Sequence, residues 1–196
     1  MSIENNELDL KIAFSLEKMM QVQRILLWEV AKNENLSPIQ IQIMVFLNSH
    51  REEFRKVSIL ADEFDLTKAT ISDAVSNLES KGIITKSKTE TDRRSYLIEF
   101  TPKGKKILSR IDSWQEELVK QIAKFPEETK ENVLVFFTEL IKHLFDSKII
   151  SIARMCLTCS NIIVGSDNKP YTCSLTGRTF DRNEITIECD HYQVKA

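Results

Sequence analysis

The stretch that decides the fold is residues 60–108, LADEFDLTKATISDAVSNLESKGIITKSKTETDRRSYLIEFTPKGKKIL. It opens within a short helical segment, SILADEFDL, and continues into a second predicted helix at residues 67–82. Thr67 suits the N-cap of that helix, and Gly82 suits its end, because glycine adopts the left-handed conformation that follows many helices. The apolar residues of this helix repeat on one face: Ile71, Val75 and Leu78.

Two β-like segments, residues 83–88 and 95–101, follow this helix. They flank the polar sequence TETDRR at residues 89–94, which has the charge of a solvent-exposed hairpin tip. Two short helices followed directly by a β-hairpin are typical of a winged helix-turn-helix. The sequence therefore predicts a mainly α protein built on a winged helix-turn-helix.

Longer helices are predicted on both sides of this segment. Residues 7–33 carry apolar side chains at three-to-four spacing: Ile12, Leu16, Met19, Leu26 and Val30. Ser37 as N-cap and Pro38 at the first helical position predict the next helix. After Thr101-Pro102 the helical spacing continues to Phe125-Pro126, where a further helix begins: Ile107, Ile111, Trp114, Leu118 and Ile122. One winged helix is too small to cover these apolar stripes, so we expect a homodimer.

The second short helix and the hairpin carry side chains suited to nucleic acid. Short polar groups on the helix can exchange hydrogen bonds with base edges in the major groove. Residues 81–94 hold five basic and two acidic residues, a local surplus of three that can contact phosphates although the net charge of the chain is −2. The candidate DNA-binding residues are Lys68, Thr70, Ser72, Asp73, Ser76, Asn77, Lys86, Lys88, Arg93 and Arg94. Arg94 is expected to enter a narrow minor groove, braced by Asp92.

The wing segment Asp92-Arg93-Arg94, followed by Phe100-Thr101-Pro102-Lys103-Gly104, resembles the multiple-antibiotic-resistance regulator (MarR) family. The resemblance is most specific over residues 57–104 and extends in helix order over residues 8–150. It implies a homodimeric transcription factor whose terminal helices form the dimer interface. The helix from Thr67 would enter the major groove and the wing the minor groove. The resemblance also implies a small-molecule effector, which this sequence does not identify.

Two other functions compete with DNA-binding regulation. Asp73 stands where the family often has a basic or neutral polar residue, and with the acidic net charge it favours a protein-interaction module without DNA binding. An enzyme is not expected, because the cysteine-rich tail offers no evident open position on a metal, which catalytic zinc normally keeps.

Every cysteine of the chain lies in the tail, residues 151–196: Cys156, Cys159, Cys173 and Cys189. Tetrahedral zinc takes four Cys or His ligands, so we expect a structural Zn²⁺ held by these thiols, with His191 as reserve ligand. An iron–sulfur cluster is the alternative, and it would make the protein a redox or iron sensor. The tail is predicted to be a small β-rich extension, with strands at KPYTCSL and ITIEC, whose folding depends on the metal.

Composition sets the class of protein. The chain has 196 residues, 42% hydrophobic and 29% charged, which is ordinary for a globular protein. The N-terminus lacks the pattern of a signal peptide, and no apolar run approaches the ~20 residues of a membrane span, so we expect a cytoplasmic protein with reduced thiols and no membrane contact. His50 and His143 are expected at the surface or in an interface.

The expected organisation has four parts. Residues 1–36 form an N-terminal dimerisation helix, and residues 37–104 form the winged helix-turn-helix DNA-binding core. Residues 105–150 form the C-terminal dimerisation helices, and residues 151–196 form the cysteine-rich metal-binding tail.

Overall fold

The computed structural model describes residues 6–88, 96–111, 114–165 and 171–194, and Lys88 by its backbone alone. The chain divides into two compact units. The first comprises residues 1–57 and 69–119, and the second residues 58–68 and 120–196. Among the described helices, none has the length and apolar character needed to cross a bilayer.

The first helix of the first unit has the predicted bounds, and the second begins where the sequence predicts. Helix α1 spans Glu7–Asn33, and the Asn6 side chain accepts a hydrogen bond from the Leu8 amide at its start. Helix α2 spans Pro38–Ser49. Ser37 and Gln40 form a capping box at its N-terminus, in which each side chain bonds the backbone of the other. The predicted N-cap and the proline at the first position are therefore confirmed.

Helix α3 (Val57–Glu63) and helix α4 (Lys68–Ser80) follow a short 3-10 turn, η1 (Glu52–Phe54). Gly82 ends α4 with a positive φ of 66°. The amide of Gly82 donates to the Glu79 carbonyl at 2.8 Å, and the amide of Ile83 donates to the Leu78 carbonyl at 3.0 Å. These bonds satisfy the last carbonyls of the helix, as expected for a glycine-terminated helix end.

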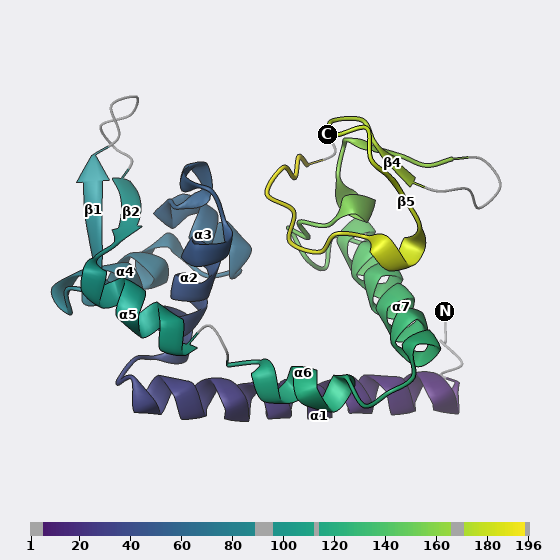
Figure 1. The fold of residues 1–196 in the computed structure, drawn as a ribbon, viewed down its shortest axis with the longest axis horizontal. Coiled ribbons are helices and arrows are strands. Elements are labelled where there is room, and N and C mark those ends of the chain that lie inside the picture. The colour runs from purple at the N-terminus through teal and green to yellow at the C-terminus, as the bar shows by residue number, and fades with distance from the viewer. Residues whose placement is uncertain (1–5, 89–95, 112–113, 166–170, 195–196) are drawn as a thin grey trace. The chain divides into compact units, whose positions relative to one another are not determined.

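The predicted hairpin forms from β1 (Ile84–Lys88) and β2 (Tyr96–Phe100), which pair antiparallel (Figure 1). The register places Ile84 opposite Phe100. The amide of Ile98 also donates to the Arg55 carbonyl at 3.2 Å, which ties the hairpin to the segment before α3.

Helix α5 (Pro102–Ile111) begins against the end of α4. The Thr101 hydroxyl donates to the Gly82 carbonyl at 2.7 Å and accepts from the Gly104 amide at 3.0 Å. The Thr101 amide donates to the Ile83 carbonyl at 3.0 Å. A Cβ at position 104 would lie 2.0 Å from the Ile83 carbonyl oxygen, so this approach requires glycine. The sequence Thr-Pro-Lys-Gly thus fixes where α5 starts.

The prediction of a single long helix after Pro102 was wrong. Helix α5 ends at Ile111, and a separate short helix, α6, spans Glu116–Ile122. Glu116 and Glu117 occupy the first turn of α6, where acidic side chains favour a helix N-terminus. Helix α7 (Glu127–Asp146) follows Pro126 as predicted, with Glu127 and Glu128 in its first turn.

The core of the first unit comes from α1, α2, α4, the hairpin and α5. Its fully buried side chains are large aliphatics: Ile41, Ile43, Met44, Leu47, Ile71, Leu78, Ile83, Ile84, Ile98 and Ile111. Helix α1 contributes little to it, because only Leu27 and Ala31 are buried over its 27 residues. Four members of its predicted stripe are half-covered, and the most exposed large apolar residues of α1 lie elsewhere on the helix: Leu8, Phe14, Met20, Ile25 and Trp28.

His50 lies in the interior rather than at a surface. Its side chain is buried and stacks on Phe46, with ring centroids 3.8 Å apart. Its Nδ1 lies 3.0 Å from the Phe46 carbonyl oxygen. The prediction for His50 was therefore wrong, because an imidazole can cover its apolar face against an aromatic ring while one nitrogen meets a backbone carbonyl. His143 is exposed.

The tail folds against α7 within the second unit (Figure 1). It holds a small sheet of β3 (Ile162–Ile163), β4 (Tyr171–Cys173) and β5 (Thr179–Phe180), and the 3-10 turns η2 (Cys156–Thr158) and η3 (Arg182–Glu184). Its core is Met155, Leu157, Tyr171, Phe180 and Ile185, against which Ile141 of α7 packs. The segment ITIEC is not a strand: Glu188 has a φ of 61°, which turns the chain before Cys189.

Candidate nucleic-acid interface

Helix α4 separates buried and exposed residues cleanly. Ile71, Ala74, Val75 and Leu78 are buried. The six residues that we predict to meet DNA on this helix are all exposed: Lys68, Thr70, Ser72, Asp73, Ser76 and Asn77. A polar helix face of this kind, held on an apolar core, has the form of a helix that can enter a major groove.

Asn77 is held by a residue of another helix. The Gln40 side chain is 5% exposed, and its Nε2 donates to the Asn77 Oδ1 at 2.7 Å. The Gln40 Oε1 accepts from the Ser37 amide at 3.0 Å, so the cap of α2 orients the Gln40 amide. The side-chain oxygen of Asn77 thereby has a partner within the protein, which leaves the side-chain NH₂ group as the donor toward a base or phosphate.

Lys86 of β1 also has partners within the protein. Its Nζ donates to the Ser76 hydroxyl at 3.0 Å and pairs with the Glu79 carboxylate at 3.0 Å. The Lys86 side chain is 20% exposed. The structure thus joins two of the predicted residues, Ser76 and Lys86, directly. It also pairs Lys86 with Glu79, a carboxylate that the sequence prediction had not included.

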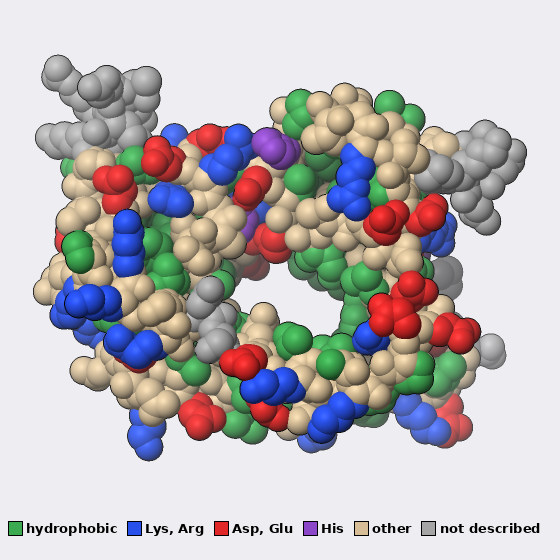
Figure 2. All heavy atoms as spheres, in the orientation of Figure 1, with side chains coloured by type: hydrophobic (Ala, Val, Ile, Leu, Met, Phe, Trp, Pro, Cys, Tyr) green, Lys and Arg blue, Asp and Glu red, His purple; other side chains and the backbone are tan. Residues whose placement is uncertain are grey.

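Other cations of this region donate to backbone carbonyls. Lys81 Nζ bonds the Asn35 carbonyl at 2.7 Å, and Lys103 Nζ bonds the Lys81 carbonyl at 2.6 Å. On the face shown in Figure 2, several basic side chains lie over the part formed by α5, a helix that contains basic residues and no acidic one. Basic side chains that can contact phosphates therefore lie on α5 as well as on α4 and the hairpin.

The wing tip lies outside the described residues. Asp92, Arg93 and Arg94 belong to it, and the side chain of Lys88 is not described either. Their contact with DNA stays a prediction.

The four thiols of the tail are all free and lie in one small unit. Cys156 and Cys159 begin and cap η2, and Cys173 ends β4. Among the described residues, no three His, Cys, Asp or Glu side chains stand together as the ligands of one ion. Burial raises the pKa of the Cys189 thiol, the His191 amide opposes this by bonding the sulfur, and repulsion from Cys156, Cys159 and Cys173 raises the pKa further. The Cys189 thiol therefore lies near enough to the other three to interact with them electrostatically. The four sulfurs are nevertheless not arranged as the ligands of one ion.

Cys173 has the opposite shift. The Thr176 hydroxyl, the Thr176 amide and the Leu175 amide bond its sulfur and lower the pKa of this thiol, because they stabilise the thiolate form.

A family model described as a winged helix DNA-binding domain matches residues 36–104. The chain contains a winged-helix domain. A curated relative, "Putative transcriptional regulatory protein for hcr operon" from Thauera aromatica, is 40% identical over 55 residues. That match covers 28% of this chain and 33% of the relative, so the chain spans about a third of the length of the curated relative that it matches.

Solved structures resemble this chain over a longer stretch than the winged-helix domain alone. Sco3205 of Streptomyces coelicolor, described as a MarR family transcriptional regulator in complex with DNA, has a TM-score of 0.61 at 16% identity, with 74% of this chain and 92% of that chain covered. The S. aureus MepR–DNA complex has a TM-score of 0.55 at 20% identity, with 72% and 99% covered. At these identities the likeness concerns the fold.

Sequence reasoning missed Gln40, Glu79 and the carbonyls that hold the lysines. Gln40 was visible as the third residue of a capping box after Ser37. Its contact with Asn77, 37 residues away, had no local signal.

Proposed function

We propose that this chain is a transcriptional regulator of the MarR type that binds double-stranded DNA as a homodimer in the cytoplasm and has no enzymatic activity. The observation that carries the proposal is the exposed polar face of α4 on a winged-helix domain, with Asn77 and Ser76 each held by a second residue. Pre-oriented side chains suit base recognition, since less conformational entropy is lost on binding. The DNA complexes of Sco3205 and MepR support the same use of this fold.

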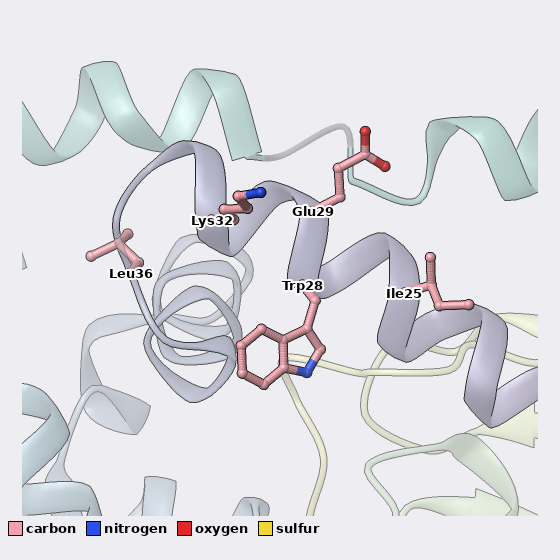
Figure 3. Close-up of a pocket in the computed structure, with 5 residues that line it drawn as sticks. All are labelled: Ile25, Trp28, Glu29, Lys32 and Leu36. Atoms are coloured by element: carbon pink, nitrogen blue, oxygen red, sulfur yellow. The ribbon is translucent and has the colours of Figure 1, made fainter.

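The homodimer is supported by apolar surface that the single chain leaves uncovered. Eight large apolar residues of α1 are exposed: Leu8, Leu10, Phe14, Met19, Met20, Val22, Ile25 and Trp28. Near its C-terminal end, α1 borders a shallow hollow of about 560 Å³, lined by Ile25, Trp28, Glu29, Lys32 and Leu36. Figure 3 shows the Trp28 ring projecting from one side of α1 and Glu29 from the other. Further exposed apolar residues lie on α6, on α7 and in the turn between them: Val119, Ile122, Phe125, Val133 and Phe136. Such surface is typical of an interface, and a second copy is the proposed occupant.

A dimer carries two α4 helices and therefore prefers an inverted repeat. Half-sites one DNA turn apart have centres about 34 Å from each other. Direct recognition would come from Thr70, Ser72 and Asn77, and Asp73 suits a cytosine amino group.

Selection from a random duplex library tests the proposal. The full chain is incubated with duplexes at low salt, and bound DNA is amplified and sequenced over several rounds. Enrichment of an inverted repeat supports the proposal. The matched variant Ser72→Ala is expected to relax one position in each half-site, while Ser109→Ala, an exposed serine on α5, leaves the selected sequence unchanged. Failure of the wild-type chain to retain any duplex at low salt would favour the protein-interaction module instead.

A further inference from the structure

Two tight turns carry Cys156, Cys159 and Cys173. Cys156 and Cys159 are joined by η2, in which the Cys159 amide donates to the Cys156 carbonyl at 3.1 Å. In the second turn the Gly177 amide donates to the Cys173 carbonyl at 2.8 Å, and Gly177 adopts a φ of 69°. This curl aims the Leu175 and Thr176 amides at the Cys173 sulfur. Tight turns whose N–H groups surround a sulfur stabilise a charged thiolate.

Backbone bonds bring the remaining segments to these turns. The β3–β4 register places Ile162, three residues after Cys159, opposite Cys173. The Ser174 amide donates to the Asn161 carbonyl at 2.8 Å. On the other side of η2, the Cys156 amide donates to the Thr186 carbonyl at 3.1 Å, and the Cys189 amide donates to the Arg154 carbonyl at 2.7 Å. The backbone segments that carry the four cysteines thus pack around η2.

The surroundings favour a charged group at this meeting point. The Asn161 Nδ2 is buried and has no hydrogen-bond partner among the described residues. It follows Cys159 by two positions, so a thiolate acceptor nearby would satisfy it.

We propose that the C-terminal unit binds one Zn²⁺ through Cys156, Cys159, Cys173 and Cys189, each of which releases its thiol proton to solvent. This site goes beyond DNA binding and does not depend on it. Because no three ligand side chains stand together now, binding requires side-chain rotation on a backbone that is already ordered. Zinc fits a site with four thiolates and no open position, which is structural rather than catalytic. His191 is exposed, and the proposed set of four thiolates leaves its side chain out.

Metal analysis of the full chain, purified anaerobically with a reductant, tests the site. The wild type is expected to hold one zinc per chain and to be colourless. Cys173→Ser and Cys189→Ser are expected to lose most of the zinc. Ser160→Ala, an exposed neighbour of Cys159, and His191→Ala are expected to keep it.

A second measurement covers the case in which the cysteine variants fail to fold. Metal-free wild-type chain is titrated with Co²⁺, whose tetrahedral thiolate complexes absorb strongly in the visible and near-ultraviolet. Thiolate-to-cobalt bands that saturate at one ion per chain support the site. Absence of zinc in the wild type together with no cobalt bands would overturn it, and so would a brown iron protein. Because neither assay involves DNA, failure of the regulator proposal would leave this result unaffected.

Discussion

Gly104→Ala tests the packing that joins the end of α4 to the start of α5. The new Cβ would stand 2.0 Å from the Ile83 carbonyl oxygen and 3.1 Å from the Phe100 ring, where separations under 3.0 Å essentially never occur. Backbone must therefore move by roughly 1 Å or more. Overpacking of this kind typically costs about 1–3 kcal/mol.

The same movement disturbs the bonds that start α5. The Thr101 amide bond to Ile83 and the Gly104 amide bond to the Thr101 hydroxyl each contribute about 0.5–1.5 kcal/mol. The higher helix propensity of alanine offsets about 1 kcal/mol of this loss in the free energy of unfolding. We therefore expect a net loss of about 3 kcal/mol in the free energy of unfolding of the first unit.

Urea unfolding followed by the fluorescence of Trp28 and Trp114 and by far-ultraviolet circular dichroism measures this loss. Lys105→Ala is the matched control, since it adds the same side chain at an exposed position of the same helix and should change stability by less than about 0.5 kcal/mol. A Gly104→Ala chain as stable as the wild type would show that α5 does not approach Ile83 as described.

Three further predictions concern the pair Glu34–Arg110, the Gln40–Asn77 contact and the exposed face of α1. The Arg110 guanidinium donates to both Glu34 oxygens, at 2.7 and 2.6 Å, and lowers the pKa of Glu34. Because the pKa of Glu34 is lower in the folded than in the unfolded chain, the pair stabilises the fold above the unfolded-state pKa, and this stability is lost as the pH falls through the folded-state pKa. Glu34→Gln should therefore be less stable than the wild type at neutral pH and as stable as the wild type in acid. Thermal unfolding of both chains across a range of pH measures this difference. Gln40→Glu keeps the acceptor for the Ser37 amide but can no longer donate to Asn77, so the Asn77 side chain should turn its NH₂ group inward and present its oxygen. Library selection should then give a changed base at one position in each half-site. An unchanged selected sequence would contradict the contact. Ile25→Glu, at a residue 64% exposed, should convert the dimer to a monomer by light scattering, whereas Lys18→Glu on the same helix should not, and a dimeric Ile25→Glu chain would place the interface elsewhere.

Local signals made most of the fold predictable. Ser37, Gly82 and Pro126 each act within a few residues, so the start of α2, the end of α4 and the start of α7 follow from the sequence alone. Apolar spacing gives α1, and two β-like segments around a polar tip give the hairpin. The separation of α5 from α6 has no such signal, because the apolar spacing runs through both helices without a break.

The candidate site was predictable in position but not in detail. An exposed polar face on α4 follows from periodicity, since the buried residues fall three and four apart. The partners of that face come from elsewhere in the chain: Gln40 reaches Asn77, and Lys86 reaches Ser76 and Glu79. Contacts of this kind depend on tertiary packing, which also explains why buried His50 was misplaced.

The central claim is that α4 of this winged-helix domain reads DNA as part of a homodimer. Its most direct test is fluorescence anisotropy of the selected duplex with the full chain over a range of salt concentrations. We predict that the logarithm of the association constant falls linearly with the logarithm of the salt concentration, and that two chains bind each duplex. Ser72→Ala should lower the discrimination between the selected and a scrambled duplex without changing the slope of the salt dependence. Equal affinity of the wild-type chain for the selected and scrambled duplexes, or an unchanged discrimination in Ser72→Ala, would contradict it.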